Sequence, residues 1–345
     1  MNRRPTMKDV AASAGVSQPT VSHVLNGTAS ISEEVTERVL KAIEDLRYVP
    51  NMVAKNLKQK KTDTIAFIIP DIDSGYYAQL AKGVEERARE HGFITFLCNT
   101  FYNPELESRY IMNLIQHKAE GIVIGYGMVK EEVYREIYKY NIPFIIVDDS
   151  ATVERYCVPS VEIDNIKGSY LAVQHLHDAG AKKLCFASEP LYNKTLRNRF
   201  EGFKRAMDEF GYEVSQDQLF IESVEYNKME MGYSIGAKIL LNGSIDAVFA
   251  SSDNLAVGIM KRFEEHNVRV PDDIIVIGYD DIPLAKLVTP ALTSIAQPKY
   301  PMGQMGVDLL MSIIKGQDIK NKRIVMEPSL IVRKSTIRNL NAWRY

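Results

Sequence analysis

The chain has 345 residues, too many for one ordinary hydrophobic core and enough for two or three domains. Its 46% hydrophobic and 25% charged residues, with a net charge of −2, are typical of a globular protein that folds in water. No apolar run approaches the roughly 18 residues of a membrane span, and the basic N-terminus lacks the apolar core of a signal peptide, so we expect a cytoplasmic protein without a membrane partner.

The first 61 residues are basic, whereas the rest of the chain is acidic. They carry ten Lys and Arg against six Asp and Glu, while the remaining residues carry 32 against 38. A basic module on an acidic body favours local contact between this module and a polyanion.

Three short helices are predicted within residues 1–49. A side-chain oxygen that accepts the free N–H groups of the first turn marks a helix start, and a left-handed glycine marks an end. The residues expected to cap the helices are Thr6, with Asp9 completing a capping box, Ser17 and Ser32, and those that end the first two are Gly15 and Gly27. A tight turn between the first two helices indicates a helix-turn-helix domain.

A hinge and linker are predicted at residues 50–63. Pro50 breaks the helical pattern, residues 51–57 can form one short helix, and a polar stretch follows. A helix of this length is not stable alone in water, so it needs another surface to form against.

From Thr64 the pattern changes to apolar strands alternating with amphipathic helices. Strands are predicted at residues 65–69, 95–98, 121–124, 144–147, 183–187, 247–249 and 274–277. Helices are predicted at residues 78–91, 107–117, 131–139, 165–179, 199–210, 255–265 and 302–314. Continuous apolar strands between helices imply parallel sheets covered on both faces, here two doubly wound subdomains that face each other across a cleft.

Functional side chains of such sheets gather where the strands end. The first predicted strand is followed by Asp73, Tyr76 and Tyr77, and later strands are followed by Asp253 and Asp280. These residues are therefore candidates for the cleft, although the aspartates could instead cap turns.

The three cysteines, Cys98, Cys157 and Cys185, are widely spaced and lie in apolar stretches. No CxxC motif and no Cys/His pair accompanies them, so we expect buried thiols in a reducing compartment and no metal site.

Enzymes and exported solute-binding proteins also contain doubly wound sheets. The chain has no Walker loop, HExxH, GxSxG or complete GxGxxG motif, so we expect no catalytic residues, no cofactor and no enzyme activity. A secreted solute-binding protein would share the two subdomains but would begin with a signal peptide in place of helices.

Residues 7–27, MKDVAASAGVSQPTVSHVLNG, closely resemble the DNA-binding motif of the LacI/GalR family of bacterial transcriptional regulators. Tyr48-Val49-Pro50-Asn51 with Ala54 and Leu57 resembles the hinge of that family. Asp272-Asp273-Ile274, Gly278-Tyr279-Asp280, and residues 289–295 followed by Gln297-Pro298 resemble its regulatory domain. The resemblance runs in order over essentially the whole chain.

The resemblance implies an all-α helix-turn-helix domain, residues 1–49, and a hinge, residues 50–63. It also implies a periplasmic-binding-protein-like (type I) body of two doubly wound parallel-sheet subdomains, one of residues 64–161 and 292–324, the other of 162–291 and 325–345. The expected function is repression of transcription by a homodimer on a palindromic operator in double-stranded DNA, controlled by a sugar-like effector. The C-terminal tail lacks heptads, so a dimer is favoured over a tetramer.

The second helix is the expected recognition helix. Gln18, Thr20 and His23 project from its start and outer face, where they can reach base edges in the major groove. The full set of candidate DNA-binding residues is Thr6, Ser17, Gln18, Thr20, Ser22, His23, Asn26, Asn51, Ala54 and Leu57. The alternative is that these are only exposed polar residues of a packing helix.

Two positions depart from the family's pattern. His23 stands where the family usually has Arg, which weakens the expected guanine contact, and Pro19 replaces a commonly polar residue. Leu57 matches the family's wedge into the minor groove, which unstacks a base step and bends the DNA. It could instead pack the linker onto the body.

The effector site is implied by the segment Arg199-Phe200-Glu201-Gly202-Phe203, which matches an RxxGF pattern whose arginine contacts the effector in this family. An arginine and an aspartate can bind hydroxyl groups while aromatic rings cover the apolar side of a ligand. The candidate effector residues are Asp73, Tyr76, Tyr77, Arg199, Tyr226, Asp253 and Asp280. For Arg199 the alternative is an exposed helical arginine.

Overall fold

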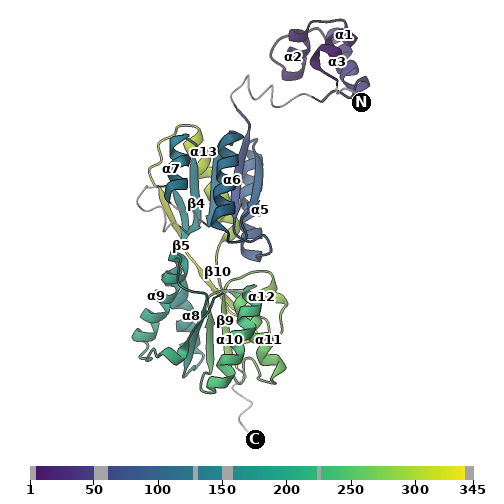
Figure 1. The fold of residues 1–345 in the computed structure, drawn as a ribbon. Coiled ribbons are helices and arrows are strands. Elements are labelled where there is room, and N and C mark those ends of the chain that lie inside the picture. The colour runs from purple at the N-terminus through teal and green to yellow at the C-terminus, as the bar shows by residue number, and fades with distance from the viewer. Residues whose placement is uncertain (1–4, 50–60, 127–130, 150–157, 224–226, 339–345) are drawn as a thin grey trace. The chain divides into compact units, whose positions relative to one another are not determined.

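The computed structural model describes residues 5–49, 61–126, 131–149, 158–223 and 227–338 (Figure 1). The chain divides into two compact units, Met1–Thr62 and Asp63–Tyr345. The hinge helix expected at residues 51–57 therefore lies outside the described residues. No helix of the described ranges combines the length and the apolar composition that crossing a membrane would require.

The N-terminal unit contains the three predicted helices, α1 (Met7–Ala14), α2 (Gln18–Asn26) and α3 (Glu33–Asp45). Thr6 and Asp9 form the expected capping box, and Gly15 and Gly27 end the first two helices with φ of 64° and 60°. Ser32 occupies the predicted N-cap position of the third helix, but its side chain makes no capping hydrogen bond. The buried core consists of Val10, Ala11, Ala14, Val21, Val39, Ala42 and Tyr48.

The second unit contains two six-stranded sheets. The first has the order β11-β5-β4-β3-β1-β2, and all its pairs are parallel. Its strands are β1 (Thr64–Ile69), β2 (Ile94–Asn99), β3 (Gly121–Tyr126), β4 (Phe144–Asp149), β5 (Ser160–Ile163) and β11 (Arg323–Met326). The strand order places β1, β3 and β4 inside the sheet, which explains their continuous apolar sequences.

The second sheet has the order β12-β10-β9-β8-β6-β7. Its strands are β6 (Leu184–Ser188), β7 (Leu219–Ile221), β8 (Ala247–Ala250), β9 (Ile275–Asp280), β10 (Thr293–Ala296) and β12 (Ser329–Ile331). All pairs are parallel except that of β12 with β10. We call the part of the unit built on the first sheet the first lobe and the part built on the second sheet the second lobe.

Helices cover both faces of each sheet, as the sequence predicts (Figure 1). In the first lobe, α5 (Gly75–Glu90) and α13 (Lys299–Ile314) pack on one face, and α6 (Pro104–Gln116) and α7 (Glu131–Lys139) on the other. In the second lobe, α8 (Asn165–Asp178) and α9 (Lys194–Glu209) lie opposite α10 (Lys228–Asn242) and α11 (Asp253–Glu265). A short helix, α12 (Leu284–Leu287), follows β9.

Three glycine contacts bring neighbouring helices unusually close. A Cβ atom added at Gly83 of α5 would lie 2.2 Å from the carbonyl oxygen of Tyr300 in α13. At Gly202 of α9 it would lie 2.2 Å from the Ile166 oxygen in α8, and at Gly258 of α11 it would lie 1.9 Å from the Met229 oxygen in α10. These helix pairs therefore pack backbone against backbone.

The chain passes between the two sheets three times in the described residues. It crosses at Asp164 after β5, at residues 297–298 after β10, and at residues 327–328 between β11 and β12. The pairing of β10 with β9 places residues 293–296 in the second lobe, whereas the expected division put residues 292–324 in the first. These crossings meet where strands end, which is where a cleft is expected.

Candidate functional site

The exposed end of α2 is a polar surface fixed by its own capping contacts. The Ser17 hydroxyl accepts from the Thr20 N–H at 3.3 Å and lies 2.8 Å from the Thr20 hydroxyl. Gln18 is exposed in the first turn, while Val21 is fully buried. The helix thus buries one face and presents Gln18 at the end where backbone N–H groups point outward.

The later part of α2 is held by contacts within the motif. The Nδ1 atom of His23 lies 2.9 Å from the Thr28 hydroxyl, and the Asn26 amide donates to the Ser22 carbonyl at 2.7 Å. His23 and Asn26 are both exposed, so their outward atoms stay accessible to a partner. The remaining DNA candidates Asn51, Ala54 and Leu57 lie outside the described residues.

The second unit contains a narrow open cavity of about 50 Å³. It is lined by Ser74, Tyr76, Tyr77, Tyr102, Tyr126, Asp148, Glu189, Asn193, Thr195, Leu196, Arg199, Lys228 and Asp280. These residues come from both lobes and lie at or after the ends of β1, β2, β3, β4, β6, β7 and β9. Four of the seven effector candidates, Tyr76, Tyr77, Arg199 and Asp280, are therefore brought together.

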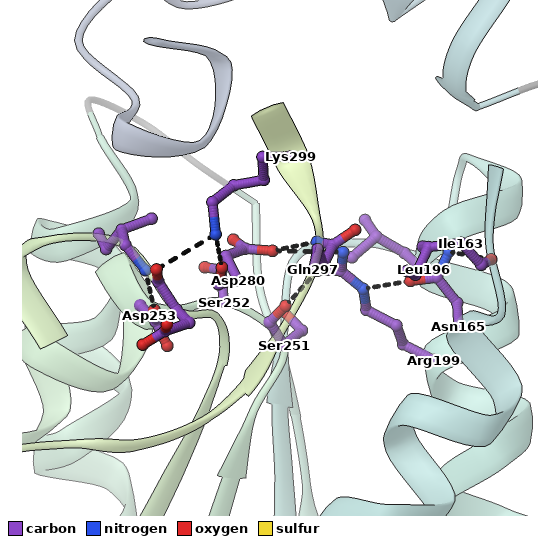
Figure 2. A network of polar contacts seen from close by, with 12 residues as sticks. Ile163, Asn165, Leu196, Arg199, Ser251, Ser252, Asp253, Asp280, Gln297 and Lys299 are labelled. Carbon is purple, nitrogen blue, oxygen red and sulfur yellow. Dashed lines mark hydrogen bonds and ion pairs between the residues drawn. The ribbon is translucent and has the colours of Figure 1, made fainter. Parts of the chain in front are cut away.

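Arg199 is the centre of a buried polar network (Figure 2). Its guanidinium donates to the Asn165 side chain at 2.9 Å and to the Ser251 carbonyl at 2.6 Å, and it pairs with Asp280 at 3.4 Å. Its Cζ atom also lies 3.8 Å from the centre of the Tyr279 ring. Burial opposes the charge, but Asp280 and Tyr279 outweigh it and raise the pKa of Arg199, so the guanidinium stays charged.

The position of Arg199 corrects one expectation. The helix begins at Lys194 and not at Arg199, so the arginine lies in the second turn. Asn193 is the actual cap, since its side chain accepts from the Leu196 N–H at 2.7 Å. The prediction started the helix too late because the first turn, Lys194 to Asn198, is mostly polar.

Asp280 faces the cavity from the end of β9. Its carboxylate accepts from the Gln297 amide at 2.6 Å in addition to Arg199. Burial raises the pKa of Asp280, and the nearby charges of Arg199, Lys228 and Lys299 counteract that rise. A ligand hydroxyl could use the remaining acceptor positions of this carboxylate.

Tyrosine rings form the opposite wall. Tyr76 and Tyr77 meet edge to face with centroids 5.0 Å apart, and Tyr102 meets Tyr126 in the same way at 5.9 Å. Burial raises the pKa of Tyr76 and Tyr77 well above the usual value, so both are neutral phenols. The buried Tyr76 hydroxyl has no hydrogen-bond partner among the described residues, so it can serve a ligand.

The cavity also contains charged and polar residues that the sequence did not predict. Lys228, at the start of α10, pairs with Glu189 at 2.9 Å, and the Asn193 amide donates to the Tyr126 hydroxyl at 3.0 Å. Burial opposes the charge of Lys228, but Glu189, Tyr102 and Asp280 together outweigh it and raise the pKa of Lys228 well above its usual value. No local motif marks either residue, because the pair is formed by segments 39 positions apart.

Two effector candidates among the described residues do not line this cavity. Asp253 is fully buried, where it accepts from the Ser294 hydroxyl at 2.6 Å and from the Ile282 N–H at 2.8 Å, so it supports the turn after β9 instead. Asp73 is exposed, and its N–H donates to Asp71 at 2.9 Å within a loop. Tyr226 lies outside the described residues.

Metal and thiol chemistry have little support in the described ranges. No group of three His, Cys, Asp or Glu side chains there is placed to hold a metal ion. Cys98 and Cys185 are thiols, and burial raises the pKa of both, which keeps them unreactive. Cys157 lies outside the described residues.

Two protein-family models match the chain. Residues 6–51 match the family described as bacterial regulatory proteins, lacI family. Residues 62–336 match periplasmic binding proteins and sugar binding domain of LacI family. Together they span both units.

Curated relatives match over nearly their whole length. The chain is 34% identical to the transcriptional repressor PurR of Mannheimia succiniciproducens, covering 96% of this chain and 98% of the relative. It is 32% identical to the regulator RegA of Clostridium saccharobutylicum (96% and 99%) and 33% identical to the ribose operon repressor of Halalkalibacterium halodurans (96% and 97%).

Solved structures agree. The lac repressor dimer bound to operator and the anti-inducer ONPF aligns with a TM-score of 0.85 at 26% identity, covering 97% of this chain and 100% of that chain. The complex of the regulator CelR with cellobiose aligns with a TM-score of 0.73 at 28% identity, covering 96% and 100%. A LacI-family regulator from Enterococcus faecium with bound ribose aligns with a TM-score of 0.71 at 30% identity, covering 79% and 98%.

Proposed function

Since the chain belongs to the LacI family of bacterial transcriptional regulators, we propose that α2 reads an operator and that the cavity binds the effector that controls this reading. The observation that carries the proposal is the cavity itself, where a charged Arg199, the Asp280 carboxylate and tyrosine rings face one another at the ends of strands. The protein acts in the cytoplasm, on the nucleoid when bound, and represses transcription without catalysing a reaction.

The effector is a sugar or a sugar derivative. An arginine–aspartate pair binds hydroxyl groups, and the tyrosine rings cover the apolar face of a pyranose or furanose. Similar proteins are named for ribose or were solved with ribose or cellobiose. A thermal-shift screen of sugars, sugar phosphates and nucleobases tests the class. A gel shift on a palindromic operator, with and without the stabilising compound, tests the link to DNA.

The regulator works as a homodimer whose two helix-turn-helix units read the two halves of a palindrome. The proposed domain boundaries are the expected ones, moved to the three crossings between the sheets. Residues 50–63 then connect these units to the lobes. Leu57 remains the proposed minor-groove wedge. The similar lac repressor structure is titled as a dimer bound to operator.

The dimer contact is proposed at β2. This strand forms an edge of the first sheet and exposes Ile94, Phe96 and Leu97 to 65%, 52% and 43%. An exposed apolar edge strand is a surface that another chain covers.

Replacing Phe96 with aspartate should therefore weaken the dimer. Loss of a central aromatic contact costs about 2 kcal/mol or more, which is roughly 30-fold in the dimer dissociation constant. Sedimentation velocity over a concentration series measures this change. Leu241→Asp, at an 87% exposed position on α10, is the matched control and should stay dimeric. An unchanged dimer with Phe96→Asp would rule out β2 as the contact.

Replacing His23 with arginine should sharpen the choice of guanine at one operator position. A good bidentate pair with guanine contributes about 1–3 kcal/mol, so preference there should rise by roughly 10-fold or more. Selection from randomised half-sites measures the base profile. Thr28→Ala, which removes the partner of the His23 ring, is the control and should leave the base profile as in the wild type. If His23→Arg leaves it unchanged too, His23 faces a phosphate.

A further inference from the structure

The turn after β9 is held in a strained conformation. Asp280 and Asp281 follow one another with φ of 109° and 50°, a region that residues other than glycine rarely adopt. A residue in this region is strained and persists only where its surroundings fix it. The contacts of this turn are therefore part of its structure.

Several of these contacts come from the second lobe. The Asp281 N–H donates to the Ser294 hydroxyl at 3.0 Å, and the Asp281 carboxylate pairs with Arg333 at 2.6 Å. The next N–H, of Ile282, donates to Asp253 at 2.8 Å. These contacts fix the amide groups of Asp281 and Ile282 and the carboxylate of Asp281. They do not fix the carbonyl groups of Asp280 and Asp281.

The two carbonyl groups are bound by Lys299, the first residue of α13. Its ammonium donates to the carbonyl oxygens of Asp280 and, at 3.1 Å, of Asp281, and its side chain is almost completely buried (Figure 2). The helix that carries it packs on the first sheet through Met302, Val307 and Leu310. Lys299 thus joins the first lobe to the strained turn of the second.

Asp280 faces two ways. Its carboxylate lies in the effector cavity beside Arg199, and its carbonyl oxygen receives the Lys299 ammonium. A ligand that donates to the carboxylate pulls on the residue whose backbone Lys299 holds and so changes the orientation of that residue. Burial lowers the pKa of Lys299 while the carboxylates of Asp280 and Asp281 oppose this, so the ammonium depends on those charges.

We propose that Lys299 is a positioning residue that sets the geometry of Asp280 in the cavity and passes a change there to helix α13. This inference deepens the proposed function and rests on it, because it names the contact through which an effector reaches the first lobe. A buried ammonium that donates to two successive carbonyl groups suits this role, because such charge-assisted hydrogen bonds fix the orientation of both groups. Lys286, which lines the same outer side of the turn but is exposed, is a natural control.

Hydrogen exchange on the full chain tests the positioning. Lys299→Met keeps the length of the side chain and removes the charge, so amides of Asp281 and Ile282 should exchange about 10-fold faster or more, the loss expected for a charge-assisted hydrogen bond. Lys299→Arg should restore most of the protection, and Lys286→Met should leave it at the wild-type level. Exchange in Lys299→Met within twofold of wild type would overturn the inference.

Lysine side-chain NMR tests the transfer and does not require Lys299→Met to fold. The Lys299 ammonium resonance, assigned by its loss in Lys299→Arg, should shift in Asp280→Asn, which removes the cavity-facing charge of the residue that Lys299 holds, and should not shift in Asp272→Asn at the surface. A fixed resonance in Asp280→Asn would show that the cavity does not reach α13. Neither measurement uses operator or effector, so a failure of operator binding would overturn the proposed function and leave these results standing.

Discussion

Replacing Arg199 with alanine is expected to abolish effector binding and to lower the melting temperature of the protein by about 10 °C. The guanidinium makes charge-assisted contacts worth roughly 10–150-fold in ligand affinity. It also holds Asn165, the Ser251 carbonyl and Asp280 together inside the second lobe. Removing one partner of a buried pair costs about 3–5 kcal/mol, because the Asp280 charge loses its counterion.

A measurement of operator binding distinguishes the loss of the effector site in Arg199→Ala from unfolding of the whole protein. The helix-turn-helix unit has its own core, so it should still bind operator below the lowered melting temperature. Titration calorimetry with the compound found by the thermal-shift screen measures effector binding, and a gel shift measures operator binding. Arg197→Ala, at an exposed position of the same helix, should change neither. Effector affinity and melting temperature both at wild-type values in Arg199→Ala would refute the site.

Replacing Gly258 with alanine is expected to destabilise the second unit by about 3 kcal/mol. In an open helix the change would stabilise by roughly 1 kcal/mol, because alanine has the higher helix propensity. Here the added methyl group would lie 1.9 Å from the Met229 carbonyl oxygen, and a backbone atom cannot rotate away. The two helices must separate, and overpacking of this kind costs 1–3 kcal/mol and sometimes more.

Urea unfolding monitored by circular dichroism measures the difference. The matched control is Ser234→Ala on the exposed face of α10, where the substitution should stay within about 0.5 kcal/mol of wild type. A Gly258→Ala protein as stable as wild type, or more stable, would mean that α10 and α11 are not packed backbone against backbone.

Local features of the N-terminal unit were predictable from sequence because they depend on neighbouring residues. The capping box of Thr6 and Asp9 and the left-handed Gly15 need only a few positions of chain. Ser32 shows the limit of such a prediction. Its residue type suits a cap, but its side chain makes no bond to the first turn of α3.

The interior strands were predictable for the same kind of reason, since β1, β3 and β8 are continuous apolar runs buried on both sides. The strands β5, β7, β10, β11 and β12 were not predicted, nor was α10. These strands are three or four residues long, and one, Arg323–Met326, alternates exposed and half-buried residues. They become strands through pairing with distant segments, which a local pattern does not contain.

The candidate site also contains some residues that the sequence predicts and others that it does not. Arg199, Asp280 and the tyrosine pair follow from the resemblance to a family, and the structure gathers them around one cavity. The orientation of Asp253 did not follow, because an acid after a strand can face a cavity or support a turn. Lys228 and Lys299 carry no motif, and only the folded chain shows what their ammonium groups contact.

The three crossings limit how the lobes can move. A body attached at one point can swing and twist freely, one attached at two points can only turn about the line between them, and a third attachment restrains even that rotation. The connectors at Asp164, residues 297–298 and residues 327–328 are one or two residues long and have little slack. Motion is thereby reduced to a slight bending at the connectors, with each sheet acting as a rigid arm. Thr64 starts a strand of six residues that runs toward this pivot, so Thr64 itself lies roughly 20 Å from it. A small bend at the pivot therefore becomes a larger displacement where the chain leads back to the N-terminal unit.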